Sequence, residues 1–132
     1  MKKVKQPAFS PVIEDFCKMT EQARLDYEWN KAEVNRLDKL TQDYLHKLEL
    51  DNLNYAERAK IATKLAECRK QRRASKDTVL ILEPFITYLE SDKGKLTLRS
   101  MKELLGNTRQ IEKRMETRSY RSKILDETTG DP

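Results

Sequence analysis

The fold is decided by residues 48–77, LELDNLNYAERAKIATKLAECRKQRRASKD, which join a turn, a helix start and the densest positive charge of the chain. Within them, Asn54 and Glu57 have the spacing of a capping box. Asn54 is expected to accept from the backbone N–H of Glu57, and Glu57 to reach back to the N–H of Asn54. A helix should therefore begin at about Tyr55, antiparallel to the helix before this short turn.

Two stripes of apolar and small residues predict the helices on either side of the turn. The first, over residues 11–50, contains Ile13, Phe16, Thr20, Ala23, Tyr27, Asn30, Val34, Leu37, Thr41, Tyr44 and Leu48. The second, over residues 55–90, contains Arg58, Ile61 or Ala62, Leu65, Cys68, Arg72, Ser75, Val79 and Leu82. Ser10 is the expected N-cap of the first helix, with Pro11 at its first position, and Pro84 is expected to kink or restart the second.

The C-terminal third is predicted to hold a loop and two short helices. Residues 91–95 have the composition of a loop. Thr97 as N-cap and Gly106 as a stop predict a helix over residues 98–105, and a further capping spacing predicts another over residues 108–122. The second of these helices has little apolar surface, which is typical of a solvated arm or a partner-binding element.

The fold class is therefore expected to be all-α, a long antiparallel hairpin followed by two short helices. Its parts are a flexible basic tail (1–10), the hairpin (11–90), C-terminal basic helices (96–123) and a disordered acidic tail (124–132). Apolar side chains remain beside the stripes at Leu40, Leu45, Ile81 and Phe85. Two helices bury only one stripe each, so self-association is expected to complete the core.

Composition restricts the class of protein further. The chain has 132 residues, 37% of them charged, and its longest aliphatic run is Val79–Leu82, far short of the roughly 20 apolar residues of a membrane span. No apolar segment follows the basic start MKKVKQPAFSP, so no secretory signal is expected and the expected location is cytoplasmic. Cys17 and Cys68 should be reduced thiols, roughly 28 Å apart along the hairpin.

Residue types that carry catalysis or metal binding are sparse. His46 is the single histidine, with only Asp43 and Glu49 near it, whereas zinc sites need three or four convergent ligands. The sequence has no glycine-rich phosphate loop, no C-x-x-C pair and no nucleophile with an adjacent base. We expect neither an enzyme nor a metal or cofactor site.

The net charge of +5 is concentrated in two basic sets. Residues 57–77 hold eight Lys and Arg against three acids. The first basic set shares one helix face and comprises Arg69, Arg72, Arg73 and Lys76. This face could bind phosphates or an acidic protein patch, or it could form interhelical ion pairs with Asp26, Glu28 and Glu33, because folding about residue 52 brings residues 28–35 beside it.

The second basic set lies in residues 95–123, which hold nine Lys and Arg against three acids. It comprises Arg109, Lys113, Arg114, Arg118, Arg121 and Lys123. Because only Glu112 and Glu116 are local acids, this set is the better candidate for an external anionic partner. The aromatic residues Tyr27, Trp29 and Tyr44 are expected in a core or a subunit interface rather than in base stacking.

The segments RLDKLTQDYLHKLEL and ERAKIATKLAECRKQRRASKD resemble small helical proteins of unknown function from phages and prophages of Gram-positive bacteria. The resemblance covers residues 27–90 and carries no functional residue. It implies a protein that regulates, binds nucleic acid or inhibits a host defence, in which case the location would be the host cytoplasm.

Three functional hypotheses follow from these patterns. The first is a non-enzymatic oligomer whose arginine-rich faces bind a phosphate-bearing partner, most readily nucleic acid. The second is a phage-type anti-defence inhibitor that binds a host protein or captures a nucleotide signal. The third is a structural assembly protein.

Overall fold

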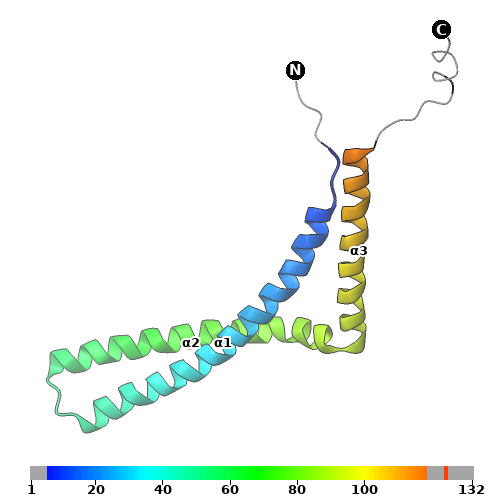
Figure 1. The fold of residues 1–132 in the computed structure, drawn as a ribbon. Helices are drawn as coiled ribbons and strands as arrows, with labels where there is room; N and C mark the ends of the chain where they lie inside the picture. The colour runs from blue at the N-terminus through cyan, green and yellow to red at the C-terminus, as the bar shows by residue number, and fades with distance from the viewer. Residues whose placement is uncertain (1–5, 119–123, 125–132) are drawn as a thin grey trace, which may run out of the picture.

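The computed structural model describes residues 6–118 and 124, and it consists of three helices (Figure 1). They are α1 (Ser10–Leu50), α2 (Tyr55–Glu90) and α3 (Asp92–Thr117). The all-α class is confirmed, and no strand occurs among the described residues. The predicted acidic tail lies outside them except for Ile124, and so does the first half of the predicted basic tail.

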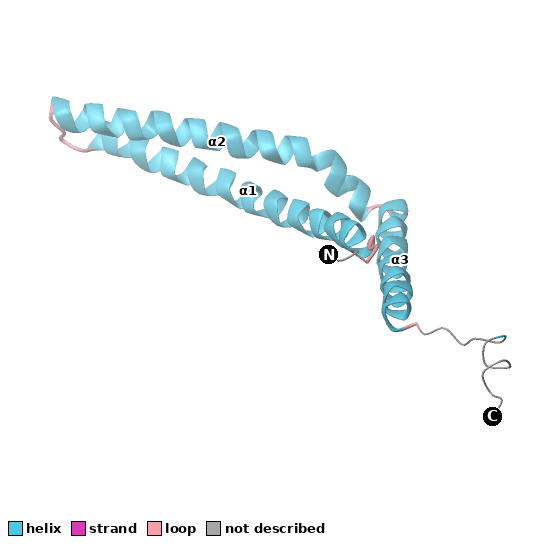
Figure 2. Ribbon diagram, turned by 90° about the horizontal axis from the view of Figure 1, so that it is seen from above, coloured by secondary structure: helices cyan, strands magenta, loops and turns pink. Residues whose placement is uncertain are grey.

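The two long helices form the predicted antiparallel hairpin (Figures 1 and 2). At the start of α2, the backbone N–H of Glu57 donates to Asn54 Oδ1 at 2.8 Å, which confirms the predicted cap. The reciprocal half of the capping box was wrong. The Glu57 carboxylate accepts from the Asn54 side-chain amide at 2.9 Å instead of the backbone N–H, because the asparagine side chain offers an NH2 donor beside the oxygen that caps the helix.

The seam between α1 and α2 follows the predicted stripes closely. Every residue of the α1 stripe is buried or partly buried, and so is the α2 stripe apart from Arg58 and Ala62. Leu37 is fully buried at the centre, and the Cys68 thiol lies 3.4 Å from its carbonyl oxygen, close to the predicted register. The hydroxyl of buried Thr41 donates to the same carbonyl at 2.8 Å, so this polar side chain needs no water.

The beginning of α1 and the region of α2 around Pro84 both differ from expectation. Phe9, not Ser10, is the N-cap of α1, and no side chain of its own helix caps it. Ser10 is the first helical residue and Pro11 the second, so Pro11 lies in the first turn but one position later than predicted. Pro84 neither ends nor restarts α2, which continues to Glu90, although Figure 2 shows a bend in its C-terminal part.

The predicted loop at residues 91–95 and the two short helices were wrong, because α3 is one continuous helix of 26 residues. Ser91 is the single non-helical residue between α2 and α3. Its N–H donates to the carbonyls of Thr87 and Tyr88, and its hydroxyl oxygen accepts from the N–H of Gly94 at 3.1 Å. One serine therefore ends one helix and caps the next.

Glycine is required at position 94 by a close approach of the two helices. A Cβ added to Gly94 would lie 1.8 Å from the carbonyl oxygen of Tyr88 and 2.8 Å from the Cα of Leu89. Gly106, the predicted helix stop, lies within α3, and a Cβ there would have nothing within 4 Å. An interior glycine costs a helix only about 1 kcal/mol, which packing of α3 overrides.

The third helix turns back so that its C-terminal half meets the beginning of α1 (Figure 1). A core cluster joins α1 to the last turns of α2; it contains Ala23, Ile86 and Leu89, with Tyr27, Leu82 and Phe85 packed against it. The part of α1 before this cluster runs toward α3. Ile13 and Cys17 on this part are buried, so α3 is the element that covers them. Phe85, expected to await a partner subunit, is used within the chain.

Candidate phosphate-binding surfaces

In residues 6–118 and 124 no group of three or more His, Cys, Asp or Glu side chains is placed to hold a metal ion. None of the three helices combines the length and apolar character that a bilayer crossing requires. Cys17 and Cys68 are both buried free thiols. The features left to consider are the two basic sets.

The first basic set is divided by a contact across the hairpin. Arg72 is partly buried, and its Nε forms an ion pair with Asp38 of α1. An interhelical ion pair was therefore predicted for Arg72, but Asp38 was not among its predicted partners. Glu33, one of the acids named for it, pairs with Arg36 on its own helix. The register itself is close to the predicted one, since Cys68 lies against Leu37, but the long Arg72 side chain leans toward the beginning of α2 and so reaches Asp38 beyond the predicted segment.

The other three members of this set, Arg69, Arg73 and Lys76, are exposed. None of them forms an ion pair with another described residue. They lie at spacings of three and four on α2, so they share one side of the helix. This side stays available to an external partner.

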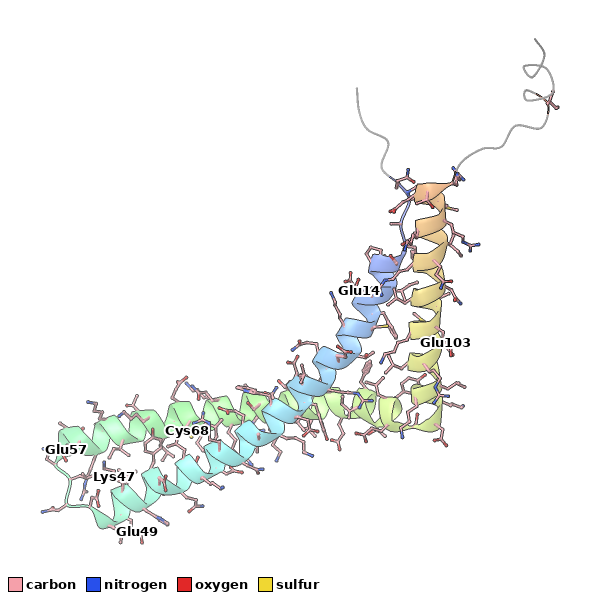
Figure 3. The ribbon with its side chains drawn as sticks, viewed as in Figure 1. Glu14, Lys47, Glu49, Glu57, Cys68 and Glu103 are labelled. Carbon is pink, nitrogen blue, oxygen red and sulfur yellow. The ribbon has the colours of Figure 1, made fainter. Side chains whose placement is uncertain are left out.

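The second basic set is also divided, because Arg109 pairs with Glu14 of α1 at 3.2 Å (Figure 3 labels Glu14). The other oxygen of Glu14 lies 3.1 Å from Lys18. The hydrogen bond and charge of Lys18, followed by Arg109, lower the pKa of Glu14 below its usual value. Arg109 is therefore a contact between α3 and α1.

Glu112 is the least expected member of this region. It was expected to neutralise neighbouring bases on its own helix, but its carboxylate caps the beginning of α1. One oxygen accepts the N–H groups of Phe9 at 2.8 Å and Ser10 at 2.9 Å, and the other accepts the Ser10 hydroxyl at 2.6 Å. These hydrogen bonds from Ser10 and Phe9 lower the pKa of Glu112. A carboxylate at a helix N-terminus is favoured by the free N–H groups and the helix dipole.

Three further members of the second set are exposed at the end of α3. Lys113, Arg114 and Arg118 form no ion pair with any other described residue. Lys113 and Arg114 line a shallow hollow with Gln110 and Thr117. Arg121 and Lys123 lie outside the described residues.

The structure adds three basic residues that were not selected from the sequence. Lys95, Arg99 and Lys102 are exposed, follow each other at helical spacings of four and three, and line one hollow with Leu98 and Glu103. They were missed because Lys95 was assigned to a loop, which interrupted the spacing. The periodicity of the three cations was itself a signal that the helix begins before residue 95.

Helical spacing brings these residues and Lys113 to the same side of α3. We call Lys95, Arg99, Lys102 and Lys113 the α3 basic flank. It extends over about 27 Å at 1.5 Å per residue. None of the four has an ion-pair partner within the described part of the chain, so all four positive charges face solvent.

Comparisons with known proteins do not add a family. No family model matches the chain, and no curated protein or solved structure shows significant similarity to it. The resemblance of residues 27–90 to phage and prophage proteins therefore stays a prediction, and the function must be argued from the surfaces themselves.

Proposed function

We propose that this protein is a non-enzymatic, self-associating helical protein that binds the phosphates of nucleic acid through the α3 basic flank. The observation that supports this is the row of four exposed cations, Lys95, Arg99, Lys102 and Lys113, none of them paired within the described chain. Phosphate binding requires only such cations, since each contact releases counterions from the nucleic acid.

The tertiary contacts favour α3 over the first basic set for this role. Glu112, which could have neutralised Lys113 or Arg109, is engaged by the backbone of Phe9 and by Ser10. The beginning of α3 is held by the Ser91 cap, and its C-terminal half is held against α1 by the Arg109 pair with Glu14. A flank held in one orientation loses less conformational entropy when it binds. Contacts to phosphate do not distinguish one base from another, so we expect binding without sequence preference.

The test is the salt dependence of binding to a fluorescent 20-base-pair duplex. The Lys95→Glu, Arg99→Glu double variant should bind more weakly, and the slope of log affinity against log salt should fall by about 0.9 for each phosphate that the variant no longer neutralises. The matched control is Lys60→Glu, Lys64→Glu, which changes the net charge equally on an exposed part of α2. Equally weakened binding in both variants would reduce the effect to net charge and contradict the assignment.

The end of α3 is tested separately with Arg114→Glu, Arg118→Glu. If these residues extend the binding surface, this variant also loses affinity while its helical circular dichroism is unchanged, because both side chains are exposed. Unaltered binding would restrict the surface to the α3 basic flank.

A structural assembly protein is the second candidate, and exposed apolar side chains favour it. Leu25, Trp29 and Ile81 each expose more than half of their surface, which is typical of residues awaiting a partner. Native mass spectrometry of the protein taken from cells without nuclease treatment separates the candidates. Nucleotide-sized added mass supports a phosphate ligand, including a captured nucleotide. A clean multiple of 15.6 kDa favours assembly, and a co-purified protein favours a host target.

A further inference from the structure

Two exposed apolar pairs lie on opposite edges of the hairpin. On α1, Leu25 is 65% exposed and Trp29, one turn later, is 63% exposed. On α2, Leu80 is 56% exposed and Ile81 is 76% exposed. Leu25 lies two positions after Ala23, which is buried in the core cluster, so helical periodicity directs it away from α2. Ile81 lies two positions after Val79 of the α2 stripe and is directed away from α1 for the same reason.

The edge formed by α1 is acidic around its apolar pair. Glu21 lies one turn before Leu25 and Glu28 adjoins Trp29; both are exposed and neither has an ion-pair partner among the described residues. The nearest cations are Arg24, which is exposed and adjoins Leu25, and Lys31, which lies over the ring of Tyr27 at 5.2 Å from its centroid. With exposed Asp26, three acids around the apolar pair outnumber these two cations, so the border of this surface is negative on balance. We call Glu21, Leu25, Glu28 and Trp29 the α1 edge.

The edge formed by α2 has the opposite charge on one side of its apolar pair. Lys76 lies one turn before Leu80 and Arg73 one turn before that; both are exposed and unpaired within the described chain. Asp77 lies between them and Leu80, and exposed Glu83 follows Leu80 by about one turn, so only the side toward Arg73 is basic. Arg73, Lys76, Leu80 and Ile81 are called the α2 edge.

We propose that the α1 edge of one copy of this chain docks on the α2 edge of a second copy. Protein interfaces combine a dehydrated apolar centre with a charged rim, and Trp and Arg are enriched at their energetic centres. The negative border of the α1 edge and the basic side of the α2 edge complement each other, whereas two α1 edges would bring together two borders that are both negative on balance.

This pairing joins unlike surfaces, so it is heterologous and repeats head to tail. Each copy keeps one free α1 edge and one free α2 edge at the ends of a growing assembly. The inference deepens the self-association in the proposed function. It is independent of phosphate binding, which the α3 basic flank carries.

The single tryptophan reports on the contact directly. In sedimentation experiments on the full chain, the mass should rise from 15.6 kDa through its multiples as the concentration increases. Trp29 emission should shift to shorter wavelength over the same range, since the contact removes the indole from water. A monomer at every concentration, or association with no change in Trp29 emission, would overturn the proposal.

Complementation between two variants tests the head-to-tail pairing. Trp29→Lys removes the α1 edge and Ile81→Lys removes the α2 edge, so each variant alone should be monomeric. Mixed, they retain one intact edge each and should form a dimer of twice 15.6 kDa that cannot grow further. The only tryptophan in the mixture belongs to the Ile81→Lys copy, and its emission should shift only when Trp29→Lys is added.

Leu50→Lys is the matched control, because Leu50 is 75% exposed, nearly the same as Ile81, but lies at the hairpin turn outside both edges. It should associate like the unaltered chain. Equally impaired association in the control, or variants that fail to complement each other, would refute the named surfaces. Duplex binding by monomeric Ile81→Lys shows whether phosphate binding persists, so failure of one proposal is distinguishable from failure of the other.

Discussion

The seam between α1 and α2 and the corner between α2 and α3 hold the same chain together in different ways. The seam repeats one simple contact, an apolar or small residue at every third or fourth position, over the whole hairpin. The corner depends on a few single groups: the Ser91 cap, the missing side chain of Gly94, and the Glu112 and Arg109 contacts to α1. The seam therefore spreads its stabilisation over many similar contacts, whereas the corner depends on a few groups that no neighbouring residue repeats.

The largest effect is expected in the centre of the seam. Leu37→Ala should lower the free energy of unfolding by about 3–4 kcal/mol, because Leu37 is fully buried and the hairpin cannot collapse around the cavity. Chemical denaturation monitored by circular dichroism measures this. Leu45→Ala, on the same helix but with Leu45 exposed, is the control and should cost far less. Similar destabilisation at both positions would mean that the seam is not the main stabilising contact.

The corner should respond to the addition of one methyl group. Gly94→Ala places Cβ against the Tyr88 carbonyl, and a backbone atom cannot yield as a flexible side chain can. We expect a destabilisation of about 2–3 kcal/mol. Gly106→Ala, in the same helix with open space around it, should instead stabilise by about 1 kcal/mol through helix propensity. Thermal unfolding of the two variants should give shifts of opposite sign, and a Gly94→Ala variant at least as stable as the unaltered chain would contradict the close approach.

The two buried thiols allow the stability of the corner and that of the seam to be compared within one molecule. Cys17 lies on the part of α1 that α3 covers, and Cys68 lies in the seam beside Leu37 (Figure 3 labels Cys68). Gly94→Ala should accelerate thiol labelling of Cys17 several-fold and leave Cys68 slow. Mass spectrometry of the labelled peptides separates the two sites. Equal acceleration at both cysteines would show that the corner and the seam open together.

Acid should weaken the corner before the seam. The pKa values of Glu112 and Glu14 are lowered from their usual value of 4.5. At a pH above 4.5 the ionised carboxylates therefore stabilise the contacts between α3 and α1, and this contribution is lost as the pH falls through the lowered pKa. The groups that face them are Ser10, Lys18 and Arg109.

Glu112→Gln should therefore be less stable than the unaltered chain at pH 7, and the difference should shrink below pH 4.5. Thermal unfolding measured from pH 7 to pH 3 checks this. A difference that does not depend on pH would assign the contact to packing rather than charge.

The smallest effect is expected at the hairpin turn. Asn54→Ala removes the oxygen that accepts from the N–H of Glu57 and should cost about 1 kcal/mol. Asn52→Ala, two residues earlier and exposed, is the control and should change the stability little. The pair shows how much of the hairpin depends on its turn rather than on its seam.

Prediction from the sequence succeeded where the determining contacts repeat locally. The stripe from Ile13 to Leu48 and the start of α2 at Tyr55 follow from periodicity and one cap, both of which are legible within a few residues. It failed at residues 91–95 because Ser91 and Gly94 there resemble loop formers. Their use as a cap and a close contact depends on the last turn of α2.

The same division applies to the candidate site. Charge counting located both basic sets, but it could not show that Arg72 and Arg109 are engaged by Asp38 and Glu14. Nor could charge counting show that Lys95 belongs to the same helix as Arg99 and Lys102. Which cations remain free depends on long-range partners, which local spacing does not encode.

The sequence alone determined the helical class, the hairpin, its seam and its register to within about a turn, because these follow from the period of apolar residues. Only the tertiary structure decided the direction of α3, the capping of α1 by a carboxylate about a hundred residues away, and the separation of a cationic flank from two apolar edges. All three features depend on contacts between side chains that are far apart in the sequence. Local spacing does not reveal such contacts, because they exist only in the folded chain.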